Sequence, residues 1–341
     1  MNREASSAKR AIYLMVATLF SVIYIYIYIS IPNSLLRDRA NYILYASDVD
    51  YFLNRYDGYD LFFNEPIFLY LNKFAFNFMD ATSVPVFFVF INTFVMMLLL
   101  LKQSKNLTFF FLGLAFIIVF PYLFQAQLIA VRQTLATSLF LLAFFYFKNH
   151  WKVLACLILC SFIHSVFFLI TFFYFINFIF FKKTSINYKI LINSVIMLLI
   201  SILFFVLLSF FGLRQADEYG EGTANVLKVG GGAFILMCAV FIGLYVQRYR
   251  LNSDLFLMVM IGLTLFVVGY FINPITGRLF NTFSPFFVLL LVSNDTKINF
   301  IILNFLVLVY GFLYFSGTYN DVFLVEYESI IDVFNRIPLG F

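Results

Sequence analysis

The stretch that decides the fold is residues 153–181, VLACLILCSFIHSVFFLITFFYFINFIFF, an apolar run bounded by lysines on both sides. As one straight helix it would be about 44 Å long, and its two basic ends would lie on opposite sides of a membrane core roughly 30 Å thick. Lysine and arginine are preferentially retained in the cytoplasm. We therefore predict a hinge around Ser161–Ser165 that joins two short helices, 153–163 and 166–181.

Composition extends this conclusion to the whole chain of 341 residues. Hydrophobic residues make up 63% and charged residues only 11%, with a mean hydropathy of +0.97, whereas a soluble domain is roughly a quarter charged. Within lipid, only helices or a closed barrel satisfy every backbone polar group. The apolar runs are long and continuous, so we predict an all-α, polytopic integral membrane protein with about eleven transmembrane helices.

The first span is predicted at 11–31, after a basic start that places the N-terminus in the cytoplasm. It is too long for a signal peptide and lacks a small-residue cleavage site, so we interpret it as uncleaved. Residues 66–79 are too short and too polar for a span and are predicted to form an interfacial or re-entrant helix. The other spans are predicted near 84–101, 107–124, 128–147, 190–211, 232–247, 255–272, 279–293 and 298–316.

This arrangement treats residues 1–341 as a single multi-pass membrane domain whose orientation follows from charge. Most Lys and Arg residues fall in the turns predicted to be cytoplasmic, as the positive-inside rule requires. Most acidic residues fall on the other side, which is weaker support because carboxylates contribute little to sorting. The segments predicted on the outer side are the loops of about 32–83 and 212–231 and the C-terminal tail of about 317–341.

Two arginines are candidates for binding an anion near the outer ends of spans. Arg132 lies one to two turns inside a predicted span, where a charged side chain is costly unless it reaches the interface or a partner. Arg278 follows Pro274 and Gly277, and helices broken in this way line protein or water-filled cavities. A guanidinium presents a planar fork that suits phosphate oxygens. A snorkelling side chain at Arg132 and an ordinary loop residue at Arg278 are the alternatives.

His164 is the candidate catalytic residue, because it lies in the predicted hinge. An imidazole with a pKa near 6.5 can accept a hydroxyl proton near neutral pH. The alternative is a structural, hydrogen-bonded histidine. Asp38 and Glu65, both in the first outer loop, could serve in acid–base chemistry or in acceptor binding, although solvated carboxylates are the common case.

These residues occur in patterns that resemble the EpsG/Wzy class of bacterial polysaccharide polymerases, which includes the O-antigen polymerases. The resemblance covers about residues 38–285, and its patterns follow one another in the same order along the chain. They are Asp38 with Tyr42, Glu65-Pro66-Ile67-Phe68, Val131-Arg132-Gln133-Thr134-Leu135-Ala136, Ser161-Phe162-Ile163-His164-Ser165, and Arg278 before the last long segments.

The resemblance implies a membrane glycosyltransferase of the bacterial cytoplasmic (inner) membrane. It would transfer a glycan chain from one undecaprenyl-diphosphate carrier to the repeat unit on another, at the outer face. Arg132 and Arg278 would bind the substrate diphosphate, and His164 would be the base. The implied partners are these lipid-linked oligosaccharides, membrane lipids and a chain-length regulator. No cofactor is implied.

Several other functions are disfavoured by the sequence. It has no Gly-rich phosphate loop, no dinucleotide-binding fingerprint and no basic, aromatic-interleaved face for nucleic acid. Cys156 and Cys160 share a helix face but have no nearby His or carboxylate, so no metal site is predicted. The alternatives that remain are an O-antigen ligase, a flippase or transporter for lipid-linked oligosaccharides, and a membrane acyltransferase.

Overall fold

The computed structural model describes residues 2–55, 64–211, 231–251, 253–272, 275–325 and 330–337. Its regular elements in these ranges are helices, and the β-type contact they include is an isolated bridge between Leu36 and Leu324. The chain divides into two compact units, which are described separately. Unit 1 is Met1–Phe168 with Leu291–Phe341, and unit 2 is Leu169–Leu290. The prediction of a single multi-pass domain stays a prediction.

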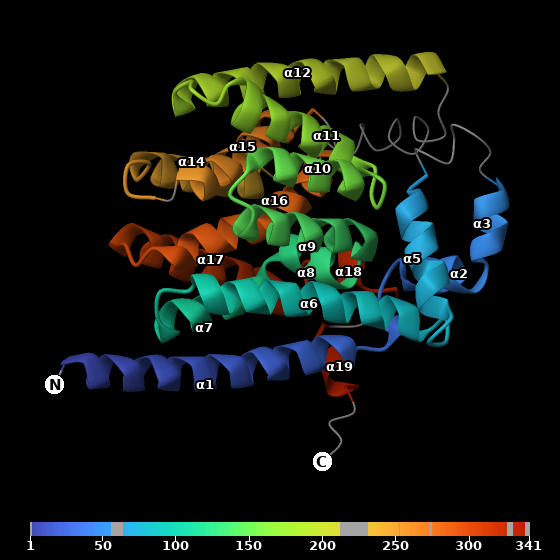
Figure 1. The fold of residues 1–341 in the computed structure, drawn as a ribbon, viewed down its shortest axis with the longest axis horizontal. Coiled ribbons are helices and arrows are strands. Elements are labelled where there is room, and N and C mark those ends of the chain that lie inside the picture. The colour runs from blue at the N-terminus through green and yellow to red at the C-terminus, as the bar shows by residue number, and fades with distance from the viewer. Residues whose placement is uncertain are drawn as a thin grey trace. The chain divides into compact units, whose positions relative to one another are not determined.

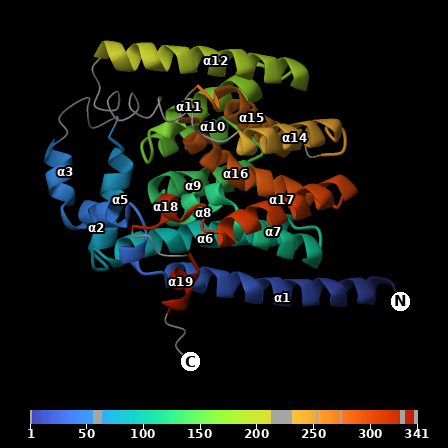
Figure 2. The same ribbon diagram turned by 180° about the vertical axis from the view of Figure 1, so that it is seen from behind.

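Unit 1 is built on a row of long apolar helices in which α1 packs on α6, α6 on α9 and α9 on α10, while α7 packs on α17. The short helices α2, α3 and α5 lie together beyond the C-terminal end of α1 (Figures 1 and 2). The helices of unit 1 are α1 (Asn2–Ile29), η1 (Asn33–Leu35), α2 (Arg39–Ser47), α3 (Val49–Arg55), α5 (Pro66–Phe76), α6 (Ser83–Gln103), α7 (Leu107–Val119), α8 (Pro121–Leu128), α9 (Val131–Tyr146), α10 (His150–Ser161), α17 (Lys297–Phe315), α18 (Asn320–Phe323) and α19 (Ile330–Asn335).

Polar residues and proline set the boundaries of these helices. The side chain of Asn106 accepts a hydrogen bond from the Phe109 N–H at the start of α7, and Asn149 does the same for Trp151 at the start of α10. Pro121, the first residue of α8, cannot donate a backbone hydrogen bond, and α8 bends by 73° away from α7 there.

Unit 2 continues α11 (Val166–Tyr174), which begins in unit 1, and contains the π-helix η2 (Phe175–Phe180), α12 (Ile186–Phe211), α14 (Gly232–Val246), α15 (Ser253–Gly269) and most of α16 (Ile275–Ser293). The helix α15 packs against both α12 and α14. It also approaches α16 closely at Gly262, where an added Cβ atom would lie 2.4 Å from the Cβ of Phe283. A larger residue at position 262 would therefore separate the two helices.

Each predicted span corresponds to an observed helix except 107–124, which breaks at Phe120 into α7 and α8, because Pro121 cannot donate the next helical hydrogen bond. Among the described residues, five helices are long and apolar enough to cross a membrane, or six if α7 and α8 form one broken span. The other predicted spans correspond to shorter apolar helices, so the count of eleven stays a prediction. The five long candidates are Ala8–Ile29, Ser83–Gln103, Ile186–Leu203, Thr276–Ser293 and Lys297–Phe315.

Exposed apolar side chains show which of the long helices have unburied faces. Only 22% of the apolar window of α1 is buried, compared with 83% of that of α16. Met15, Leu308 and Phe312 are each more than two-thirds exposed. Contact of these apolar surfaces with water is unfavourable. Lipid tails are as apolar as the exposed side chains and can cover them at no such cost.

The hinge predicted within residues 153–181 is confirmed. The helix α10 ends at Ser161, and α11 begins at Val166. The amide of His164 still bonds the carbonyl of Cys160 at 3.0 Å, and the amide of Phe167 bonds the His164 carbonyl at 3.0 Å. The helix predicted within 66–79 is likewise found as α5. The predicted outer loop 212–231 lies, except for Gly231, outside the described residues.

The segments predicted to form the first outer loop and the C-terminal tail are joined within unit 1. The amide of Arg37 bonds the carbonyl of Phe323 at 3.1 Å, and the amide of Val325 bonds the carbonyl of Leu35 at 3.1 Å. Leu36 and Leu324, which form the bridge between them, are both buried. The loop and the tail must therefore lie on the same side of any membrane that the helices cross.

A pair of buried asparagines supports a prediction about the stability of unit 2. The side-chain amides of Asn177 and Asn193 bond each other reciprocally at 2.8 and 2.9 Å. We expect Asn193→Leu to destabilise the protein by about 1–2 kcal/mol, because it leaves the Asn177 amide without this buried partner. Thermal unfolding in detergent measures this change.

The matched control is Asn304→Leu, because the Asn304 amide bonds the Phe300 carbonyl one turn earlier in its own helix. That variant should unfold at nearly the wild-type temperature. The double variant Asn177→Leu with Asn193→Leu should recover part of the stability, because neither amide is then left buried. Equal unfolding temperatures for Asn193→Leu and wild type would contradict the prediction.

Candidate functional site

Glu65 lies at the centre of a cluster of ionisable side chains in unit 1. It is the N-cap residue of α5 and has left-handed backbone angles of φ 61° and ψ 51°, which are uncommon for a residue other than glycine. Pro66 begins α5, and the next amide, of Ile67, donates to the carbonyl of Phe162 in the hinge at 3.0 Å. The start of α5 is thereby fixed to the hinge, and the strained conformation directs the Glu65 carboxylate to one place.

The Glu65 carboxylate joins two segments that are distant in the sequence. Its Oε2 atom accepts a hydrogen bond from Nη1 of Arg132 at 2.5 Å, and its Oε1 atom accepts one from the backbone amide of Ser165 at 3.2 Å. The Glu65 side chain is 10% exposed and that of Arg132 is 31% exposed. A largely buried carboxylate is thus neutralised by a guanidinium that still reaches the surface.

His164 lies beside the same carboxylate. Its Nδ1 atom is 3.8 Å from Oε1 of Glu65, which is too long for a hydrogen bond. The Nδ1 atom instead accepts a hydrogen bond from the Val166 amide at 3.2 Å, at the start of α11. In this arrangement a neutral imidazole carries its proton on Nε2.

Aromatic rings from two further helices surround the Arg132 guanidinium. Its Cζ atom lies 5.7 Å and 5.2 Å from the ring centroids of Tyr42 and Tyr45 in α2, and 5.8 Å from that of Phe68 in α5. These distances are within the range of cation–π attraction. The Nε atom of Arg132 is buried and has no hydrogen-bond partner among the described residues. The rings therefore hold the cation in place and leave part of its donor capacity unused.

A second arginine supports the turn that carries Arg132. Arg39 is almost completely buried, and its Nε atom donates to the carbonyl of Leu128, the last residue of α8, at 2.8 Å. Burial lowers the pKa of Arg39 to about 10, so the guanidinium stays charged at neutral pH. The helix α9 begins three residues after Leu128. Arg39 thus fixes the turn between α8 and α9.

The structure brings three of the five predicted site residues together, namely Glu65, Arg132 and His164. Asp38 is exposed at the N-cap of α2, the helix that carries Tyr42 and Tyr45, and it too has a positive φ, of 63°. Arg278 is exposed on α16 and belongs to unit 2.

Sequence reasoning missed the rings around Arg132 and the buried Arg39. Tyr42 and Tyr45 are spaced by three residues, which places both rings on one face of a helix. That spacing is a signal that could have been used. Nothing local distinguishes the buried Arg39 from the exposed Arg37, because their burial depends on how α2 packs.

The sequence model of the EpsG family matches residues 22–329. This range includes the whole cluster around Glu65 and the buried Arg39. No curated protein matches the chain, and no solved structure matches it.

Proposed function

Because the chain belongs to the EpsG family, we propose that it is a polymerase of polysaccharide repeat units at the outer face of the bacterial cytoplasmic membrane. Family membership and the apolar helices support the coarser description of a multi-pass membrane protein of polysaccharide biosynthesis. The observation that carries the finer proposal is the cluster of Glu65, Arg132 and His164. These residues come from three segments and belong to the three patterns that resemble the polymerases.

The proposed reaction joins two glycans that are each linked to undecaprenyl diphosphate. The hydroxyl oxygen of the acceptor repeat unit attacks the anomeric carbon of the donor chain. As this glycosidic bond forms, the bond from that carbon to the diphosphate oxygen breaks, and its electron pair leaves with undecaprenyl diphosphate. The hydroxyl proton passes to a base. The protein therefore has to stabilise a departing anion, accept a proton and hold two lipid-linked substrates in place.

Arg132 is the proposed ligand of the leaving diphosphate. Its guanidinium has five N–H donors; one bonds Glu65, and the Tyr42 hydroxyl is a second side-chain partner, which leaves donors for a substrate. The Nε atom is buried without a partner among the described residues, so an oxyanion that reached it would satisfy a donor that is costly to leave unpaired. Glu65 and the rings keep the fork fixed before the charge develops. Arg278 is proposed as a second diphosphate ligand.

His164 is proposed as the base, with Glu65 as the residue that orients it. When the Val166 amide bonds Nδ1, the Nε2 atom carries the proton and cannot accept another. If the ring moves so that Nδ1–H donates to Oε1 of Glu65, now 3.8 Å away, Nε2 exposes its lone pair. This is the usual arrangement of a base and its orienting carboxylate. Asp38 is proposed to contact the acceptor.

The joined loop and tail support the proposed sidedness. Glu65 lies in the first predicted outer loop, and residues 35–37 of that loop pair with residues 323–325 of the tail. The hinge and the start of α9 contact Glu65 and therefore share its side. We propose that this side is periplasmic, that the N-terminus is cytoplasmic and that about eleven segments cross the membrane.

Variants of His164 test the proposal. In His164→Asn, the side-chain oxygen can still accept the Val166 hydrogen bond, but it cannot take up a proton at neutral pH. We expect His164→Asn and His164→Ala each to lower polymer formation by at least about 100-fold, the usual contribution of a general base. The measurement is a gel of the ladder formed in membranes supplied with lipid-linked repeat units and no lipid-core acceptor.

The control is His150→Asn, because His150 lies at the start of α10, away from the hinge. Equal amounts of each variant in the membrane fraction show that the chain still inserts. Normal ladders from His164→Asn would show that His164 only accepts the Val166 hydrogen bond at the start of α11 and is not the base. If the wild-type protein instead forms no ladder until a lipid-core acceptor is added to the membranes, glycan transfer to that acceptor would identify a ligase.

A further inference from the structure

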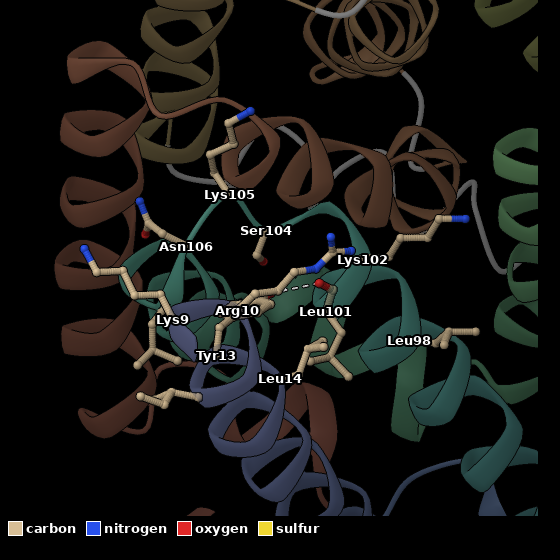
Figure 3. Close-up of a pocket in the computed structure, with 12 residues that line it drawn as sticks. Lys9, Arg10, Tyr13, Leu14, Leu98, Leu101, Lys102, Ser104, Lys105 and Asn106 are labelled. Carbon is tan, nitrogen blue, oxygen red and sulfur yellow. Dashed lines mark hydrogen bonds between the residues drawn. The ribbon is translucent and has the colours of Figure 1, made fainter. Parts of the chain in front are cut away.

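A second polar site lies at the C-terminal end of α6 in unit 1. It is a pocket of about 780 Å³ between the start of α1 and the junction of α6 with α7 (Figure 3). The helix α6 runs from Ser83, near the loop that contains Glu65, to Gln103 at this pocket, which is about 30 Å at the usual rise per residue. That length is close to the thickness of a bilayer core. The pocket lies at the Gln103 end of α6, whereas the start of α9, which carries Arg132, contacts the middle of α6, where Asn92 donates to the Val131 carbonyl at 3.4 Å.

Four cationic side chains surround this pocket, and none of its lining residues in the described chain carries a carboxylate. Figure 3 shows Arg10 reaching from α1 across the pocket, with Ser104 near its centre and the ammonium groups of Lys9, Lys102 and Lys105 around the rim. Lys102 Nζ also lies 4.0 Å from the ring centroid of Tyr146, which fixes this cation at the rim. The site thus has a positive potential that its own residues do not neutralise.

The pocket also contains a buried hydroxyl, that of Ser104, which lies next to the Tyr13 hydroxyl. The Oγ atom of Ser104 is buried and makes no hydrogen bond of standard geometry among the described residues. The neighbouring hydroxyl of Tyr13 donates to the carbonyl of Leu101 at 2.8 Å. A buried hydroxyl is normally hydrogen-bonded, so an acceptor from outside the chain that entered the pocket would give the Ser104 hydroxyl a better-placed partner than the neighbouring Tyr13 hydroxyl.

Apart from Asn106 and the Tyr13 hydroxyl, the remaining lining is apolar and partly exposed. Ile12 and Leu14 of α1 are 56% and 46% exposed, and Leu98, Leu101 and Leu107 complete the wall. A small inorganic anion would make no use of this surface, whereas an anion attached to an acyl chain would cover it. The pocket thus combines a basic rim, a central hydroxyl donor and a hydrophobic wall.

We propose that this pocket binds an anionic phospholipid, with the phosphate between Arg10 and Ser104 and the acyl chain against the leucines. Basic residues at a membrane surface attract anionic lipids, and a pocket adds a defined position for one headgroup. The lipid would hold the N-terminal end of α1 against the junction of α6 and α7. The proposal requires only that the helices lie in a membrane, so it is independent of the proposed polymerase activity.

The experiment is lipid titration of the purified full-length protein by native mass spectrometry. The probes are phosphatidylglycerol, phosphatidylcholine with the same acyl chains, and inorganic phosphate. The wild type should retain one phosphatidylglycerol in preference to phosphatidylcholine. The triple variant Arg10→Gln, Lys102→Gln, Lys105→Gln should bind phosphatidylglycerol at least about tenfold more weakly, because three cations near the headgroup are lost.

A second triple variant separates the pocket from general surface charge. Lys148→Gln, Lys152→Gln and Lys182→Gln remove the same charge from exposed lysines that do not line the pocket, and this protein should bind like the wild type. Ser104→Val, which preserves shape but removes the donor, should weaken binding by about threefold.

Three results would overturn the proposal. The first is unchanged phosphatidylglycerol binding by the pocket variant, and the second is an equal loss in both triple variants. The third is competition by inorganic phosphate at the same concentration as the lipid, because the acyl chain would then contribute nothing. Polymer formation is not part of the readout, so failure here would leave the proposed polymerase untouched.

Discussion

Leucine at both position 65 and position 132 is expected to restore part of the stability that either single substitution removes, because the ion pair is then replaced as a whole although the Ser165 amide still lacks its acceptor, while polymer formation stays lost. Glu65→Leu leaves the Arg132 guanidinium beside apolar rings without its carboxylate, and Arg132→Leu leaves a carboxylate that is only 10% exposed without its cation. Removing one partner of a buried ion pair costs about 3–5 kcal/mol, whereas replacing both with apolar residues is often neutral. Because Arg132 is 31% exposed, we expect about 3 kcal/mol for each single variant.

Two measurements on the same three proteins test this expectation. Thermal unfolding in detergent gives the stabilities, and the gel of polymer formed from lipid-linked repeat units gives the activities. Recovery of stability in the double variant without recovery of polymer would show that the pair does more than hold the fold. Polymer of normal length and yield from the double variant would rule out the proposed contact of Arg132 with the diphosphate.

A milder change distinguishes the geometry of Arg132 from its charge. Arg132→Lys keeps a cation beside Glu65 but replaces the planar fork with a single ammonium group. If bidentate contact with diphosphate oxygens matters, this variant should also lose most of its polymer while staying close to wild-type stability. An Arg132→Lys protein with both wild-type stability and wild-type polymer formation would mean that only the positive charge at position 132 is needed.

The helices and the hinge could be predicted because their causes are local in the sequence. Each apolar run has to form a helix in lipid, and the run of 153–181 is too long for one span whose two ends are both basic. The observed break between Ser161 and Val166 follows from these two facts. The number of spans does not follow from them, because short apolar helices such as α10 can cross, re-enter or pack internally.

The site residues could be named from the sequence, but their contacts could not. Glu65 is 67 residues from Arg132 and 100 residues from Ser165, and no local pattern brings such distant positions together. Their contact depends on the fold, in which the Ile67 amide bonds the hinge carbonyl of Phe162. The same is true of the rings around Arg132, which α2 supplies from the first loop.

Arg39 provides the second large expected effect, because it holds the turn that presents Arg132. The Leu128 carbonyl, at the end of α8, has no later turn of that helix to bond it, and Arg39 Nε satisfies it at 2.8 Å. We expect Arg39→Met to destabilise the protein by about 2–3 kcal/mol, through the loss of a buried hydrogen bond from a charged group. Polymer formation should fall further than stability alone explains, because Arg132 lies four residues beyond this carbonyl.

The matched control is Arg37→Met, two residues earlier in the chain. Arg37 also donates from Nε to a backbone carbonyl, that of Leu324 at 3.0 Å, but its side chain is exposed. Water can replace that bond, so the change in stability should stay below about 1 kcal/mol. Thermal unfolding and the polymer gel on both variants decide the matter. Equal losses of stability in Arg39→Met and Arg37→Met would show that burial does not explain the importance of Arg39. An Arg39→Met protein that is as stable as the wild type but inactive would indicate that Arg39 contacts the substrate and does not hold the turn.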